Sequence, residues 1–317
     1  MHLPVLSKKP GYAGIAGSLL LGTTLWLAPV QPVVAATAVS AQAPQAAAEA
    51  EYVDLPQQQL AYLQLPQGTV VLLLADAFTP QTSKRFRQLV QQRFYDGLPF
   101  YRVIDQFVLQ AGLPPGETHP RQTYPAFAGI KAEFSWPVRR QDPFVLVQQG
   151  DLLAAQTGFN QGFAVGRDLT EGREWLLHCP NVVVMARSSD PDSATTDFAI
   201  MQGQAPRHLD KNMAIFARVI WGQQWLNLVQ RADPAKGGIL AATEPRSSIR
   251  QIRLGHELAA DQQLALQIQQ APTAAFAAKI AARRQRADAF YIDKGNGKLD
   301  ICYQALPVRL KPAGSVK

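Results

Sequence analysis

The chain has 317 residues, of which 47% are hydrophobic and 17% are charged, so it is long and apolar enough to bury a full core as one large domain or two small ones. Its 31 basic and 24 acidic residues give a net charge of +7, which is too mild a balance to predict nucleic-acid binding. The densest basic run, residues 283–286, is expected on the solvated face of a helix.

The first residues predict an export signal. Lys8 and Lys9 precede an uncharged stretch, residues 11–30, and small residues follow at 33–35 and 36–38, either of which could be the cleavage site. An uncleaved membrane anchor is the alternative, because the apolar stretch approaches spanning length. Residues 1–35 are therefore interpreted as a signal peptide and residues 36–55 as a low-complexity linker, which predicts an exported, periplasmic protein that meets a membrane only through an uncleaved signal.

A strand and a helix are expected next. Residues 68–74 form a continuous apolar run that is typical of a buried strand. Thr79 and Pro80 are a favourable helix start, because a hydroxyl residue is followed by proline at the first turn. Phe86, Leu89 and Val90 then fall on one helical face.

Residues 100–112, F-Y-R-V-I-D-Q-F-V-L-Q-A-G, place Arg102 in an apolar strand, with Phe107 and Gln110 at fixed distances after it. Phe107 and Gln110 differ in parity, so a flat strand would aim them at opposite faces. The pattern therefore requires a turn or bulge near Asp105 and Gln106. Further short strand-like runs follow at residues 181–186, 196–200, 214–219 and 248–254.

The pattern of residues 100–112 resembles the signature of the cyclophilin-type peptidyl-prolyl isomerases, F-[HY]-R-[IV]-I-x-x-F-x-x-Q-x-G. The later runs resemble strands of that family in the same order. The resemblance implies a mainly β fold, a closed antiparallel β-barrel capped by two helices. Residues 56–256 are accordingly interpreted as a cyclophilin-like domain and residues 257–317 as a C-terminal extension.

The resemblance also implies a chemistry. Rotation about an X-Pro amide must break C–N resonance, but no covalent bond forms or breaks, so neither metal nor cofactor is expected. Arg102 would donate to the prolyl nitrogen lone pair that appears only in the twisted state. Phe107 would lie under the proline ring, and Gln110 would bind the substrate backbone and steady Arg102. The implied partners are proline-containing polypeptides, bound by a monomer.

The remaining groove positions match the family only in part. Three positions keep the residue types usual in the family, namely Met185, Ala186 and Leu209. Three depart from them: Asp197 stands where glutamine is usual, Ala199 where phenylalanine is usual and Met213 where histidine is common. The departures keep an alternative open, a proline-peptide binding or chaperone module with little or no turnover. For Asp197, three ideas remain: it draws Arg102 away from the prolyl nitrogen, it orients Arg102, or it faces solvent.

In the extension, two i, i+4 pairs predict two amphipathic helices separated near Pro272, namely Leu264 with Ile268 and Phe276 with Ile280. Residues 290–292 and 299–301 predict a hairpin with an Asn-Gly turn. The two cysteines, Cys179 and Cys302, either pair in an oxidising compartment or remain buried free thiols.

Overall fold

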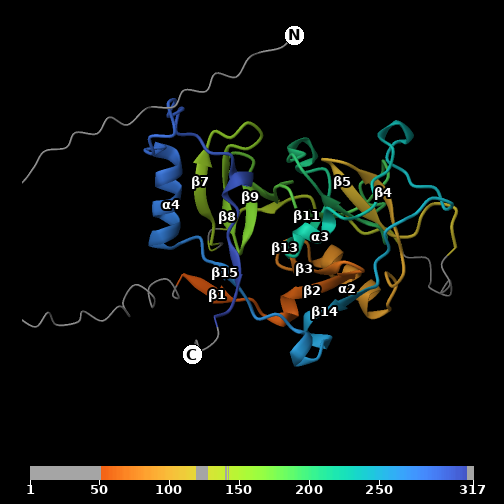
Figure 1. The fold of residues 1–317 in the computed structure, drawn as a ribbon. Helices are drawn as coiled ribbons and strands as arrows, with labels where there is room; N and C mark the ends of the chain where they lie inside the picture. Colours follow the sequence, from red (N-terminus) through yellow and green to blue (C-terminus); the bar gives the residue numbers. More distant parts are fainter. Residues whose placement is uncertain (1–50, 119–127, 140, 142, 313–317) are drawn as a thin grey trace, which may run out of the picture. The chain divides into compact units, whose positions relative to one another are not determined.

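The computed structural model describes residues 51–118, 128–139, 141 and 143–312 (Figure 1). The predicted signal peptide and residues 36–50 of the predicted linker lie outside the described residues. Described strands form three sheets, and the largest has eight strands. In spatial order these are β14 (Gln251–Leu254), β2 (Leu60–Leu65), β3 (Gly68–Leu74), β13 (Ile215–Trp221), β11 (Val182–Met185), β12 (Phe198–Met201), β5 (Val108–Ala111) and β4 (Phe100–Ile104).

The eight-stranded sheet curls until its two edges meet. Just before β4 and β14, backbone hydrogen bonds run from Gly97 N to Ile249 O (2.8 Å), from Ile249 N to Leu98 O (2.9 Å) and from Phe100 N to Ser247 O (2.9 Å). Every strand pair in this sheet is antiparallel. The mainly β, barrel-type fold expected from the sequence is confirmed.

Inside the curl lies an apolar cluster that contains Phe86, Tyr95, Phe198 and Phe216, each at most 1% exposed. Phe86 belongs to α2 (Pro80–Gln91), the first of the expected helices. The second, α3 (Gln223–Leu226), is a single turn. Short 3-10 helices complete the helical elements: η1 (Gln57–Gln59), η2 (Arg207–Leu209), η3 (Pro234–Lys236), η4 (Gly255–Glu257), η5 (Ala260–Gln262) and η6 (Ile301–Gln304).

Helix α2 begins at Pro80 as predicted, but its cap comes from elsewhere in the chain. The Thr79 hydroxyl donates to Ile215 O (2.9 Å) and caps no amide of the first turn. The Glu133 carboxylate accepts instead from Gln81 N (3.0 Å) and Thr82 N (2.8 Å). A carboxylate at this position also complements the positive end of the helix dipole.

A five-stranded antiparallel sheet covers part of the outer face of the barrel. Its strands were not predicted from the sequence. Its spatial order is β6 (Trp136–Pro137), β10 (Arg173–Leu176), β9 (Phe163–Asp168), β8 (Gln156–Asn160) and β7 (Val145–Gln149). Phe159, Val165 and Trp175 of this sheet belong to one buried cluster with Leu73 and Val184 of the barrel wall. The barrel strands are therefore buried on both faces.

The C-terminal extension corrects two predictions. The helix expected around Leu264 and Ile268 is instead strand β15 (Leu266–Gln269), which pairs with β1 (Tyr52–Asp54) on one side and β16 (Val308–Leu310) on the other. Pairing on both edges satisfies its backbone, and this outweighs the local helical spacing. Strand β1 lies inside residues 36–55, the predicted linker.

The hairpin predicted at residues 290–301 is also wrong. Asp293 and Asn296 side chains accept from Gly295 N (2.7 Å) and Lys298 N (3.0 Å), so local turns replace strand pairing. The second expected helix is confirmed as α4 (Ala274–Gln285), which lies beside β7 and β8 (Figure 1). Its Phe276 packs edge-on against Phe159, with ring centroids 5.8 Å apart.

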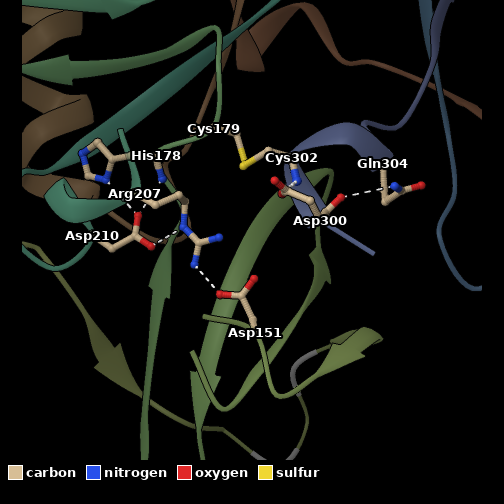
Figure 2. Close-up of a disulfide and its surroundings, with 8 residues drawn as sticks. All are labelled: Asp151, His178, Cys179, Arg207, Asp210, Asp300, Cys302 and Gln304. Atoms are coloured by element: carbon tan, nitrogen blue, oxygen red, sulfur yellow. Dashed lines mark hydrogen bonds and ion pairs between the residues drawn. A yellow bond between two sulfur atoms is a disulfide. The ribbon is translucent and has the colours of Figure 1, made fainter. Parts of the chain in front are cut away.

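Cys179 and Cys302 form a disulfide that joins the start of β11 to the extension (Figure 2). Of the two alternatives left by the sequence, the paired one is therefore found. Among the described residues, no helix has both the length and the apolar character needed to cross a membrane.

Candidate active site

Arg102, Gln110 and Ala199 occupy one row across three neighbouring strands. Arg102 on β4 lies opposite Gln110 on β5, and Gln110 lies opposite Ala199 on β12, so the three side chains share a face of the sheet. Arg102 is half-buried, and its guanidinium donates from Nη1 to Gln110 Oε1 (3.4 Å) and from Nε to Gly237 O (3.3 Å). The cation is thus held on the outer face and keeps partial access to solvent.

The turn required by the motif is present between β4 and β5. Gln106 adopts a left-handed conformation with φ of 58°, and Phe107 N donates to Ile104 O (3.2 Å). Phe107 O accepts from Gln202 N (2.8 Å), which fixes the turn against the residue after β12. Because of this turn, the alternation of side chains along β4 does not continue unchanged into β5, as the sequence predicted.

Tyr101 links Gln110 to Asp197. The Tyr101 hydroxyl donates to Asp197 Oδ2 (2.7 Å), and Gln110 Nε2 donates to the Tyr101 hydroxyl oxygen (2.5 Å). Since Gln110 Oε1 accepts from Arg102, the order of contacts is Asp197, Tyr101, Gln110, Arg102. Asp197 therefore reaches Arg102 through two neutral side chains, and no direct ion pair between them is found in the described part of the chain.

The Asp197 carboxylate is partly desolvated, and burial raises its pKa, against the lowering effect of hydrogen bonds from Tyr101, Thr196 and Leu113. Burial, and then the charge of Asp197, raise the pKa of Tyr101 well above its usual value. Tyr101 therefore stays protonated near neutral pH and can act only as a donor toward the carboxylate.

Gly112, the last residue of the motif, makes room for Asp197. Its φ is 149°, and a Cβ there would lie 2.2 Å from Asp197 Oδ1. The neighbouring Leu113 N donates to the same oxygen (3.3 Å). Glycine is needed because the carboxylate packs directly on the backbone.

The other predicted groove residues are brought together only in part. Phe107, Leu209 and Met213 are partly exposed and pack on the cluster that contains Ala199. Met185 is 1% exposed and belongs to the interior cluster, so it lies on the opposite face of the sheet. Ala199 is only 3% exposed, and Ala186 is partly exposed just beyond β11. Tyr101 was not predicted as a site residue; the one feature of the sequence that points to it is its hydroxyl group directly before Arg102.

A buried ion-pair cluster holds η2, which carries Leu209, against the five-stranded sheet's loops (Figure 2). Arg207 donates from Nε to Asp210 Oδ2 (2.5 Å) and pairs through Nη2 with Asp151 Oδ1 (3.0 Å). His178, which is fully buried, lies with Nδ1 3.2 Å from Asp210 Oδ1. The position of Leu209 at the candidate site is therefore fixed by charge-assisted contacts.

Residues 60–252 match the family described as cyclophilin type peptidyl-prolyl cis-trans isomerase/CLD. This chain belongs to that family. The match spans more than half of the sequence and includes the Arg102 motif, the barrel strands and the five-stranded sheet.

Relatives in the cyclophilin family match over limited lengths. The peptidyl-prolyl isomerase cwc-27 of Neurospora crassa is 27% identical over 180 residues, which is 56% of this chain and 30% of that protein. The peptidyl-prolyl cis-trans isomerase of Synechococcus elongatus is 45% identical over 56 residues, 18% of this chain and 39% of that one. The chain thus spans about a third of the length of the curated relatives that it matches.

One solved structure supports the fold over most of the molecule. Cyclophilin AquaCyp293 from Hirschia baltica superposes with a TM-score of 0.66 at 20% identity, covering 87% of this chain and all of that one. At this identity the similarity concerns the fold alone.

Proposed function

We propose that this protein is a peptidyl-prolyl cis-trans isomerase that accelerates X-Pro isomerisation in exported polypeptides, without a cofactor and as a monomer. The observation that carries the proposal is Arg102, a half-buried guanidinium held by Gln110 and Gly237 on the same barrel face as Phe107. Family membership supports the reaction class. Lys8, Lys9 and the apolar stretch after them support the exported, periplasmic location.

The mechanism follows from the barrier, which is about 18–20 kcal/mol because the planar amide is conjugated. As the C–N bond twists, the prolyl nitrogen becomes pyramidal and its lone pair can accept a hydrogen bond. Arg102 donates to that lone pair, which the planar ground state does not offer, so the bond lowers the barrier and not the ground state. Phe107 supports the ring and Gln110 fixes the angle of the guanidinium.

The decisive experiment measures isomerisation of a short X-Pro peptide by NMR exchange, with the purified chain, Arg102→Ala and Arg250→Ala. Arg250 is exposed on the segment before β14 and matches the charge change. We expect Arg102→Ala to lower kcat/KM at least about tenfold, which corresponds to the roughly 1.5–3 kcal/mol of a charged hydrogen bond. Wild-type rates in Arg102→Ala, with an unchanged circular dichroism spectrum, would refute the mechanism.

The second candidate is a proline-peptide binding or chaperone module with little or no turnover. It is favoured by Met185, whose side chain belongs to the interior cluster, and by Ala199, which supplies no aromatic wall. Peptide binding by calorimetry without rate enhancement in the exchange experiment would support this candidate over the first.

A further inference from the structure

Arg218 is a partly buried cation without a counter-ion among the described residues. It lies in β13, opposite Leu73 of β3 and Val182 of β11, both of which belong to the outer cluster. Its Nε and Nη2 are buried and have no hydrogen-bond partner in the described part of the chain. Burial lowers the pKa of the guanidinium to about 10, and no carboxylate contributes to that value, so Arg218 is still charged near neutral pH.

An arrangement of this kind is costly on its own. Burying a charged group is unfavourable unless it is paired and hydrogen-bonded, and leaving its donors unmade adds to the cost. The nearest aromatic contact is weak, because Arg218 Cζ lies 5.9 Å from the centroid of Phe163. An anion bound at Arg218 would supply both the counter-charge and the acceptors that its buried donors lack.

Arg218 lines a cavity of about 440 Å³, a size typical of sites for small molecules. The walls come from three regions: Phe159 and Leu176 of the five-stranded sheet, Ile215 and Ile220 of β13, and Leu306 of the extension. No aspartate or glutamate lines the cavity, and its uncharged amide side chains belong to Asn181, Gln223 and Gln224. The cavity thus offers one positive charge among lining residues that are mostly apolar in type, with polar backbone and side-chain atoms exposed between them.

The disulfide forms part of the same wall. Cys179 and Cys302 both line the cavity, and their bond ties β11 to the extension that closes it (Figure 2). Four strand-to-strand steps separate β13 from β4, which carries Arg102, so the cavity is distinct from the candidate active site.

We propose that this cavity binds a small monocarboxylate with an apolar body, the carboxylate meeting Arg218 and the body filling the space between the barrel, the five-stranded sheet and the extension. A carboxylate matches the planar fork of the guanidinium and neutralises its single charge. A phosphate dianion would carry one charge more than Arg218 can neutralise, and no second basic residue lines the cavity. A neutral ligand would leave the arginine unpaired. The proposal is independent of isomerase activity.

The experiment titrates the purified full chain with octanoate, 4-phenylbutyrate, octanamide and inorganic phosphate, using calorimetry and thermal unfolding. We expect at least one of the two carboxylates to bind and to raise Tm, and octanamide to bind at least about tenfold more weakly than octanoate if octanoate is the binder. Arg218→Met should lower carboxylate affinity at least about tenfold, whereas Arg250→Met, a matched loss of charge at an exposed site, should not.

Without ligand, Arg218→Met should be as stable as the wild type or more stable, because an unpaired buried charge is replaced by an apolar side chain of similar length. Should that variant fail to fold, the Arg218 Nε–H resonance in the wild type must still shift on addition of the carboxylate. The proposal is overturned if neither carboxylate binds, if Arg218→Met binds equally well, or if phosphate binds more tightly than both.

Discussion

The two faces of the eight-stranded sheet carry different kinds of core. On the inner face, Phe86 of α2 packs its ring against the rings of Phe198 and Phe216. On the outer face, the five-stranded sheet and the extension enclose a looser interior, where Arg218 and Asn160 have buried polar atoms without partners among the described residues. The comparison shows that packing on the inner face stabilises the barrel. The outer cover, formed by the five-stranded sheet and the extension, instead encloses a cavity and leaves Arg102 partly exposed to solvent.

The largest effect should come from the inner face. Phe86→Ala removes a ring that contacts Tyr95, Phe198 and Phe216, and we expect the free energy of unfolding in urea to fall by about 3–5 kcal/mol. Phe276→Ala, in α4, is the matched truncation on the outer cover and should cost less, because α4 packs on one side only. Equal losses at the two positions would show that the two cores are equally important to stability.

The disulfide tests the outer cover as a unit. Cys302→Ser opens a bond that spans 123 positions, and we expect a loss of about 2–4 kcal/mol in the free energy of unfolding. Isomerisation should be retained, since neither cysteine belongs to the row of Arg102. The double variant Cys179→Ser/Cys302→Ser controls for a reactive free thiol, and a loss of activity in both variants would show that the cover also shapes the site.

A smaller effect is expected where the outer face stays open. Asp197→Ala breaks the contact with Tyr101, so Gln110 should hold Arg102 less firmly and kcat should fall about two- to tenfold, with KM little changed. Tyr101→Phe breaks the same chain without altering charge, and the double variant should be no slower than the slower single one. We expect Asp197→Gln to lower kcat as well, whereas a rise in kcat would support the idea that Asp197 restrains Arg102.

The smallest effect is a pH dependence of stability. Burial raises the pKa of Asp197, so the native state binds this proton more tightly than the unfolded state does. The contribution of Asp197 is thus complete below its unfolded pKa of about 3.9 and is lost as pH rises through the folded value. Relative to wild type, Asp197→Asn should become more stable as pH rises from about 3 to 7, measured by urea unfolding; a constant difference would contradict the assignment.

The sequence predicted the barrel and the turn between β4 and β5, because Arg102, Phe107 and Gln110 lie within nine positions and the parity of Phe107 and Gln110 demanded a turn. The roles assigned to these three side chains stay predictions. The partnership of Tyr101 with Asp197 could not be predicted, because it joins residues 96 positions apart and depends on the pairing of β12 with β5. In the extension, Leu264 and Ile268 have helical spacing, whereas Leu264, Leu266 and Ile268 together alternate as in a strand. Pairing with β1 and β16, which are distant in sequence, decided for the strand.

The five-stranded sheet was missed for a physical reason. Two of its strands contain Gly158 and Gly166, residues that weaken strand propensity but are needed here, since a Cβ would lie 2.2 Å from Val145 O and 2.6 Å from the Trp175 ring. An indirect signal did exist. Val182–Met185 and Phe198–Met201 are apolar at every position, which is typical of strands buried on both faces and so implies a second covering layer.

The Glu133 cap of α2 makes the barrel and the segment outside it interdependent. Gln81 and Thr82 receive their hydrogen-bond acceptor from a residue about fifty positions further along the chain, while Thr79 is engaged with Ile215. A minimal barrel prepared by excising the segment between β5 and β11 would therefore carry a helix with two amides left to water. For protein engineers, the smallest separable version of this scaffold has to keep Glu133 or supply a new acceptor at residue 79.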